Sequence, residues 1–324
     1  MNLVKKMNKN IGFFTTKKNS EENRFFSEAL KEKYDVAFFN WYDYAKASNI
    51  EKFYNHSDSK FFKDKKVWDI NDFDLIHVLA MGQFKGREKE VNSFFYHLNN
   101  LKNLIIINRP SVMIKNLDKS YLLNLQEKGI PTIPTLDISK KSSKKEILQN
   151  LKEKFCRDIE DVVLKPKYFG ERSNSVVRLS NLNEKSLEKY YEKNNNWGVL
   201  AQEFISTIIK DNEKSLIYVE TNFSHAVMRY KERNGWLPSV GENARKPKSI
   251  NTTKDELRLC ERVLETQYPD HNPITRFDLI GSRNFPMISE VEEINPSLYL
   301  NKISSKQLDN FMMHYKNALE RKLS

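Results

Sequence analysis

The sequence predicts an α/β protein in which a parallel-sheet domain is followed by two α+β lobes. Over about the first 100 residues, apolar runs alternate with segments of helical period, which is typical of a small parallel sheet. Beyond Pro110 strands and helices follow each other in mixed order. The chain has 324 residues, 39% of them apolar, which is enough for two or three compact units with real cores.

The first domain is expected to cover residues 1–108. A helix at 20–32 is indicated by Phe25, Phe26, Ala29 and Leu30, which recur at helical spacing. The segment 49–68 is polar and aromatic without a clear period, so we expect a loop-rich insertion there. The other expected elements are strands at 11–15, 35–39, 73–80 and 104–108 and a helix at 91–101.

The rest of the chain divides into a small lobe with its linker, at 109–200, and a C-terminal lobe, at 201–324. A capping box, Ser304-x-x-Gln307, starts the last helix, and Gly129 closes an early one. The expected helices are 117–128, 143–155, 184–192, 253–265 and 304–319, with an extended linker around Pro131 and Pro134. The expected strands are 162–166, 175–179, 198–205, a long strand at 215–229, 275–280 and 286–292.

Composition limits the classes of function. The net charge of +11 favours an anionic partner, such as nucleotide phosphates or an acidic substrate. No apolar run approaches the roughly 20 residues that span a bilayer, and the basic N-terminus leads into no signal core. We therefore expect a cytoplasmic protein that does not enter a membrane. Cys156 and Cys260 belong to no CxxC pair, so we expect two buried thiols rather than a disulfide or a zinc site.

Acidic residues cluster on the last predicted strand. Glu290 and Glu292 alternate along it, so their side chains share one face. Two carboxylates on one face repel each other unless a cation lies between them, and Mg²⁺ prefers such oxygen ligands. Asp278 adds a third carboxylate near the end of the preceding predicted strand. The alternative is a pair of solvated acids on an edge strand.

Two further segments could bind a nucleotide. The apolar run at 162–166 ends with Lys165, followed by Pro166 and Lys167, and a lysine so placed is a natural phosphate ligand. The strand containing Gln202 and Glu203 could offer its backbone to an adenine edge, and Glu213 its carboxylate to ribose. A surface turn in the first case and an ordinary hairpin in the second are the alternatives.

Taken in order, these segments resemble the ATP-grasp superfamily from about residue 108 to 300. The resemblance is strongest to the branch of prokaryotic glutathione synthetase and the cycloserine-forming ligase. It implies ATP contacts for Lys119 in NLDKSYL and for Lys165 in VVLKP, with Lys167 beside it. It implies adenine contacts for Gln202, Glu203, Phe204 and Ile205, and a ribose contact for Glu213. It also implies a place near the transferred phosphate for Arg229, which ends FSHAVMR. For RFDLIG and SEVEEINPSLYL it implies the metal ligands Asp278, Glu290 and Glu292, with Asn295 as an alternate.

The resemblance implies an ATP-dependent ligase with ATP and Mg²⁺ (or Mn²⁺) as cofactors. A carboxylate would be activated as an acylphosphate and captured by an amine, or by a thiol or hydroxyl. Arg229, with Arg245, would stabilise charge on the transferring phosphoryl group. The substrate would be an amino acid or a peptide-like molecule, and the loops at 168–175 and 237–248 would close over it. A homodimer is compatible with this family.

Departures from the family pattern keep alternatives open. The phosphate-covering loop, GERSNS, keeps only Gly170, and Ser215 stands where glutathione synthetases have an arginine. Glutathione synthesis itself is therefore not expected. A peptide-crosslinking ATP-grasp maturase is one alternative, and a degenerate domain that binds nucleotide without ligation is another. From a different class, the charge and the 12% aromatic content permit a nucleic-acid-binding protein without catalysis, although no known nucleic-acid motif occurs.

Overall fold

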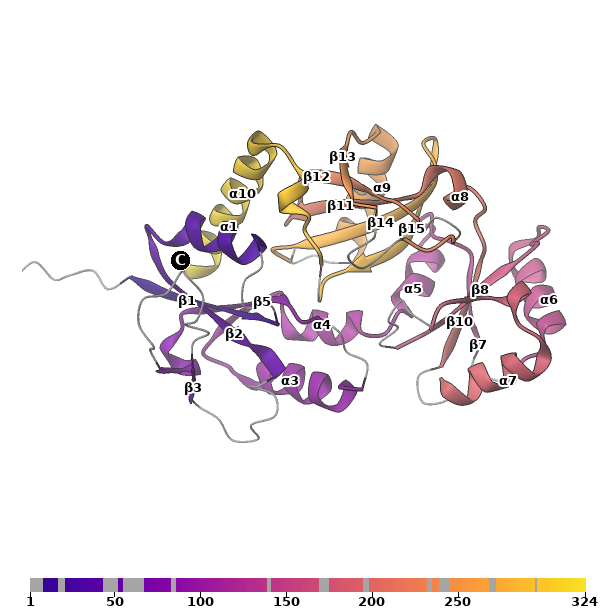
Figure 1. Ribbon diagram of the computed structural model, residues 1–324, viewed down its shortest axis with the longest axis horizontal. Helices are drawn as coiled ribbons and strands as arrows, with labels where there is room; N and C mark the ends of the chain where they lie inside the picture. The colour runs from indigo at the N-terminus through magenta and orange to yellow at the C-terminus, as the bar shows by residue number, and fades with distance from the viewer. Residues whose placement is uncertain are drawn as a thin grey trace, which may run out of the picture.

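A computed structural model describes most of the chain. It covers residues 8–16, 21–42, 52–54, 67–82, 86–138, 141–168, 175–194, 198–231, 235–238, 245–267, 272–294 and 296–324. Three α/β units follow one another (Figure 1): the N-terminal sheet at the left, the C-terminal lobe in the centre and the small lobe at the right. Among the described residues, no helix is both long and apolar enough to cross a membrane.

The first unit is the predicted parallel sheet. Its four strands are mutually parallel in the order β2-β1-β5-β6. In the predicted insertion, two short strands pair, while residues 49–51 and 55–66 lie outside the described part of the chain. The elements are β1 (Lys9–Thr15), α1 (Glu21–Leu30), β2 (Tyr34–Asn40), β3 (Lys52–Tyr54), β4 (Val67–Asp69), β5 (Leu75–Ala80), α3 (Glu88–Asn100), β6 (Ile105–Ile107) and α4 (Pro110–Asn116).

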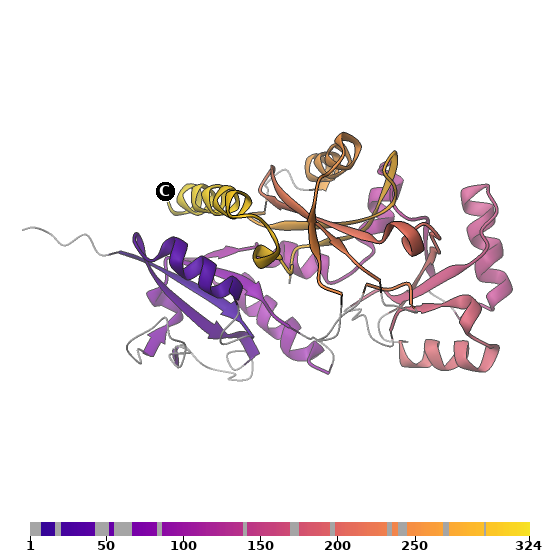
Figure 2. The same cartoon turned by 45° about the horizontal axis from the view of Figure 1, so that its top comes forward.

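The last helix of the chain, α10 (Ser305–Leu323), completes this first unit. Together with α1 it covers one face of the sheet, and α3 and α4 cover the other (Figure 2). Phe26 packs edge-on against Phe311 and Tyr315. The Tyr315 hydroxyl lies 2.7 Å from Nδ1 of His77 on β5, and burial lowers the pKa of His77 to about 3. The imidazole is therefore neutral at physiological pH.

The small lobe is an antiparallel sheet in the order β7-β10-β8-β9. Two helices pack on one face, and side chains of the other face line the pocket described below. The predicted boundary at residue 200 falls inside β10. The elements are β7 (Thr135–Ile138), α6 (Lys144–Phe155), β8 (Val162–Pro166), β9 (Val177–Arg178), α7 (Glu184–Lys193) and β10 (Val199–Glu203).

The C-terminal lobe is a five-stranded antiparallel sheet in the order β13-β12-β11-β14-β15. Helices α5 and α9 pack on the face opposite the cleft. Because α5 comes from the segment predicted to open the small lobe, the chain crosses between lobes more than once. The elements are α5 (Tyr121–Glu127), α8 (Ile208–Asp211), β11 (Glu213–Val219), β12 (Asn222–Arg229), β13 (Lys248–Ile250), α9 (Lys254–Gln267), β14 (Thr275–Ser282) and β15 (Phe285–Glu292).

Two predicted elements differ from the structure, one in where it begins and one in being a hairpin. The helix expected at 117–128 begins only at Tyr121, and Lys119 lies in the turn after α4. The Lys119 amide donates to the carbonyl of Lys167 at 2.8 Å, and the Asp118 carboxylate accepts the Ser120 amide at 2.8 Å, so these groups are diverted from a helical ladder. The strand expected at 215–229 is a hairpin that turns at Glu220, whose φ is 53°.

Smaller features of the sequence prediction can also be checked. The capping box at Ser304 and Gln307 is confirmed. Gly129 has φ 69°, as its position after α5 requires. Cys260 is buried as expected, but Cys156 is exposed, because it ends α6 in a left-handed conformation at the surface.

Candidate functional site

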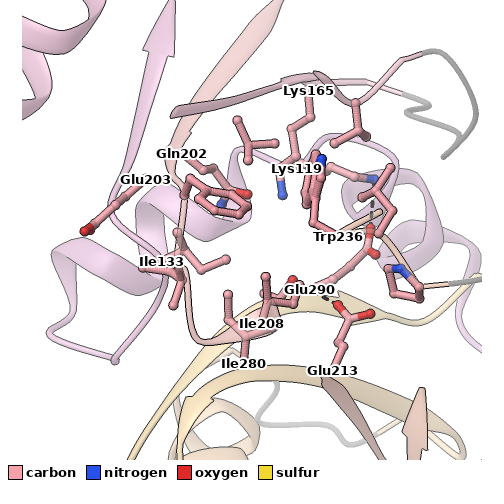
Figure 3. Close-up of a pocket in the computed structure, with 17 residues that line it drawn as sticks. Lys119, Ile133, Lys165, Gln202, Glu203, Ile208, Glu213, Trp236, Ile280 and Glu290 are labelled. Carbon is pink, nitrogen blue, oxygen red and sulfur yellow. Dashed lines mark hydrogen bonds and ion pairs between the residues drawn. The ribbon is translucent and has the colours of Figure 1, made fainter. Parts of the chain in front are cut away.

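A pocket opens between the small lobe and the C-terminal sheet (Figure 3). Its empty volume, counted with the solvent-filled space at its mouth, is about 820 Å³. Strand alternation on β8 explains its upper wall: Val162 and Leu164 point into the core of the small lobe, so Val163 and Lys165 face the pocket.

One end of the pocket is charged. Lys119 and Lys165 point into it from one side, and Glu290 and Glu213 lie on the other (Figure 3). Lys119 Nζ is 3.0 Å from Glu290 Oε1. Although burial opposes it, the Glu290 carboxylate raises the pKa of Lys119. Burial, assisted by the Lys119 charge, lowers the pKa of Lys165 to about 8. Two lysines of this kind form a site for an anion.

Behind this end lies a buried network around Asp278, which has no exposed surface. Its carboxylate accepts hydrogen bonds from Ser215 Oγ at 2.6 Å, from Arg229 Nη1 at 2.6 Å, and from Arg276 Nε and Nη2 at 2.9 Å each. Arg229 Nη1 also lies 3.1 Å from Glu213 Oε2. The network fixes two guanidinium groups on the cleft face of the sheet.

Arg276 is the charged residue of this network to which the sequence analysis gave no role. It precedes Asp278 by two positions on β14, so both side chains share the cleft face. The signal was present in RFDLIG, since an arginine in an otherwise apolar buried strand needs a partner. Its partner is the carboxylate that the sequence assigned to metal.

The other end of the pocket is apolar. Phe204 and Trp236 meet edge-on there, with ring centroids 5.6 Å apart. The Arg178 guanidinium lies 3.8 Å from the Phe204 ring centroid. Such a wall suits a flat aromatic ligand, such as a nucleobase. The remaining apolar lining residues are Ile133, Val163, Val176, Ile205, Ile208, Leu237, Pro238 and Ile280.

The polar residues of β10 behave differently from each other. Gln202 is buried and its side-chain amide donates to Thr135 Oγ1 at 2.8 Å. The Glu203 side chain points away from the pocket (Figure 3) and pairs with Arg157. Glu203 therefore offers the pocket its backbone rather than its carboxylate.

Two other predicted site residues lie outside the pocket lining, and a third is not among the described residues. Lys167 pairs with Asp137 at 2.7 Å and does not belong to the described pocket lining. Arg245 lies over the Tyr230 ring, 3.6 Å from its centroid, and is also outside that lining. Asn295 lies outside the described residues, as do 169–174 and 239–244 of the two predicted closing loops.

The predicted metal ligands can be tested for fit. Glu290 lies opposite Asp278 and Glu292 opposite Arg276 in the β14–β15 register. Among the described residues, no three His, Cys, Asp or Glu side chains converge closely enough to hold a metal. Mg²⁺, however, commonly takes only one or two carboxylates together with substrate phosphates. Glu290 and Glu292 fit that role, whereas the oxygens of Asp278 are engaged by Ser215 and the two arginines.

Comparisons with known proteins give structural but not sequence relatives. The sequence matches no family model, and no curated protein matches it. D-cycloserine synthetase DcsG is similar with a TM-score of 0.72 and 17% identity, over 97% of this chain and 100% of that chain. A RiPP-associated ATP-grasp ligase from Chryseobacterium gregarium, in complex with ADP and a leader and core peptide, has a TM-score of 0.61 and 14% identity over 97% of each chain.

A third solved structure, D-alanine–D-alanine ligase from Bacillus anthracis complexed with ATP, has a TM-score of 0.58 and 16% identity. The similarity covers 98% of this chain and 96% of that chain. The chain has the ATP-grasp fold, and the predicted fold class is confirmed.

Proposed function

We propose that this protein is an ATP-dependent ligase that joins a carboxylate to an amine, or to a thiol or hydroxyl, through an acylphosphate. Its substrate is an amino acid or a peptide-like molecule. One observation carries the proposal: Lys119, Lys165, Glu213 and Glu290, from four separate segments, line one pocket of an ATP-grasp fold.

The pocket suggests how a nucleotide would lie. The base fits the wall of Phe204 and Trp236, beside the backbone of β10, and Glu213 is within the same pocket for the ribose hydroxyls. The phosphates would then reach Lys119 and Lys165. Glu290 and Glu292 would hold Mg²⁺ or Mn²⁺, whose charge offsets that of the phosphates. Further metal contacts by Asp278 and Asn295 stay predictions.

The reaction needs positioning and neutralisation of charge more than covalent help from the protein. A carboxylate oxygen of the substrate attacks the γ-phosphorus, the bond to the bridging oxygen breaks, and ADP leaves. The nucleophile then attacks the carbonyl carbon of the acylphosphate, and phosphate leaves. Lys119 and Lys165 hold the phosphate oxygens, while Arg229, held by Asp278 and Glu213, supplies positive charge behind them.

Calorimetry and a substrate screen test this proposal. ATP should bind in the presence of Mg²⁺, and ADP release should require both Mg²⁺ and a suitable carboxylate among amino acids and dipeptides. Glu290→Gln should abolish turnover while the protein stays folded. Absence of ATP binding with Mg²⁺ present, or salt-sensitive binding of single-stranded nucleic acid that nucleotide does not affect, would contradict the assignment.

The same chemistry can operate within one peptide. The net charge of +11 favours a substrate with several acidic side chains. Co-expression with candidate peptides, followed by mass spectrometry, distinguishes a peptide-crosslinking maturase from a ligase that acts on free amino acids. A crosslinking maturase removes one water per bond from the peptide, whereas a ligase for free amino acids leaves the peptide mass unchanged.

A further inference from the structure

The edge strand of the C-terminal sheet is completed by side chains. β15 carries Glu290 and Glu292 and pairs with β14 on one side only. The outward N–H and C=O groups of such a strand need partners when they are buried. At Ile288 these partners are the backbone of Pro131 and Ile133, at 2.9 and 3.2 Å. Beyond Ile288 the partners are side chains instead of backbone groups.

At Val291 the partner is the hydroxyl of Tyr121. It accepts the Val291 N–H at 3.0 Å and lies 3.1 Å from the Val291 carbonyl oxygen, to which it can donate. A hydroxyl has one donor and two acceptor sites, so it can replace the N–H and C=O of a neighbouring strand residue. The Tyr121 side chain is itself almost fully buried, in the core that includes Leu122 and Val291.

At Val291 and Glu293 the second partner is the side-chain amide of Asn116. Its Nδ2 donates to the Val291 carbonyl at 2.9 Å, and its Oδ1 accepts the Glu293 N–H at 3.2 Å. The amide thus spans the strand on both sides of Glu292. Asn108 extends the pattern, since its Nδ2 donates to the Glu293 carbonyl at 2.7 Å.

Asn116 and Tyr121 belong to the segment that carries Lys119. Asn116 is the last residue of α4 and Tyr121 the first of α5, with Lys119 in the turn between them. We call residues 116–121 the clamp segment. Its side chains form hydrogen bonds with the backbone of β15 next to Glu290 and Glu292. Its Lys119 Nζ lies 3.0 Å from the Glu290 carboxylate. The lysine and the two glutamates are therefore held relative to each other by one short piece of chain.

We propose that Tyr121 and Asn116 are positioning residues, which hold Glu290 and Glu292 at the spacing that a divalent cation on the nucleotide requires. This inference rests on the proposed function. Neither residue lines the described pocket, so each acts through the β15 backbone rather than by contact with ligand. Groups that orient metal ligands in this way typically affect metal affinity by about 10- to 100-fold.

Tyr121→Phe tests the proposal, because it removes the hydroxyl and keeps the ring in the core. Tyr191→Phe is the matched control: its hydroxyl donates to a backbone carbonyl, that of Ser142, at 2.9 Å, but in the small lobe. ADP affinity is measured by calorimetry with Mg²⁺ and with EDTA, and stability by thermal melting. We expect Tyr121→Phe to need about tenfold more Mg²⁺ for the same ADP affinity. Its affinity in EDTA, and both affinities of Tyr191→Phe, should match wild type.

A second variant covers the case in which Tyr121→Phe does not fold. Asn116→Ala should raise the Mg²⁺ requirement in the same way, again with unchanged ADP affinity in EDTA. If folded Tyr121→Phe or Asn116→Ala shows the Mg²⁺ dependence of wild type, the positioning role is wrong, while the ligase proposal stands. If wild type binds no ADP under either condition, both the inference and the proposed function are wrong.

Discussion

The two ends of the cleft are built in different ways. At the charged end, which we call the phosphate end after the function proposed above, ion pairs join Lys119 to Glu290, and Arg229 to Glu213 and Asp278. At the apolar end, which we call the base end after the same proposal, Phe204 and Trp236 lie on connecting segments and make an aromatic contact. The difference indicates that charge and rigid geometry are concentrated where phosphates would react, and that the base end contributes shape. The experiments below test this division.

The largest loss is expected from Lys165→Met. Lys165 faces the pocket from a buried strand, and a hydrogen bond to a charged group contributes about 1.5–3 kcal/mol. ADP affinity, measured by calorimetry with Mg²⁺, should fall about 100-fold. Lys167→Met is the control, because Lys167 pairs with Asp137 outside the pocket lining, and it should change affinity less than about twofold. Equal effects of the two variants would contradict the assigned phosphate end.

A smaller loss is expected from Trp236→Ala at the base end. Stacking of a base on an aromatic side chain is worth about 1–3 kcal/mol, and Trp236 lines the pocket beside Phe204. ADP affinity should fall about tenfold. The loss should persist at high salt, because it does not depend on charge. If Trp236→Ala binds ADP as tightly as wild type at high salt, the lost interaction is electrostatic, and the assignment of Trp236 to the base end is contradicted.

A pH titration should show a more modest change. The pKa of Lys165 in the empty pocket is about 8, and bound phosphate favours its charged form. Above that pH the empty pocket must take up a proton on binding, so affinity falls as pH rises. From pH 7 to pH 9, ADP affinity should drop in wild type by less than about tenfold, which is the limit that a pKa of about 8 sets for a lysine that is charged in the complex. Lys165→Met should flatten this part of the profile, and an unchanged slope in the variant would assign the titration to another group.

The smallest effect is expected from Glu203→Gln. Although Glu203 lines the pocket, its carboxylate points away and pairs with Arg157 at the surface. ADP affinity should stay within about twofold of wild type, and stability should fall by less than about 1 kcal/mol in urea unfolding. Glu213→Gln is the comparison, because the Glu213 carboxylate contacts Arg229. This variant should lower ADP affinity more than Glu203→Gln does.

The charged residues that line the pocket could be singled out in the sequence because they interrupt apolar patterns. Lys165 ends an apolar strand, and Glu290 and Glu292 share the face of another, so each stands out against apolar neighbours. Ile208, Ile280 and Trp236 follow the pattern of ordinary core residues, and nothing local distinguishes a residue that lines a pocket from one that fills a core. At the apolar end, the sequence analysis therefore indicated only the segment from Gln202 to Ile205.

The parallel sheet of the first unit could also be predicted, since its apolar strands alternate with helices of clear period. The ends of elements elsewhere in the chain were harder to predict from the sequence. The hairpin at Glu220 has no glycine or proline, so two apolar strands looked like one. The turn around Lys119 depends on a hydrogen bond to Lys167, which lies 48 positions later in the chain (167 − 119 = 48). Contacts of such separation leave no mark in a local pattern.

The placement of α10 has a consequence for synthesis on the ribosome. The N-terminal sheet leaves the exit tunnel before α10, but one of its faces, including Phe13 and Phe38, is covered partly by residues 305–323. Until these residues are translated, that face lacks Phe311 and Tyr315 and exposes apolar surface. A nascent chain stopped before α10 should therefore recruit holding chaperones, and a truncated product should be cleared by proteases rather than accumulate as a separate domain.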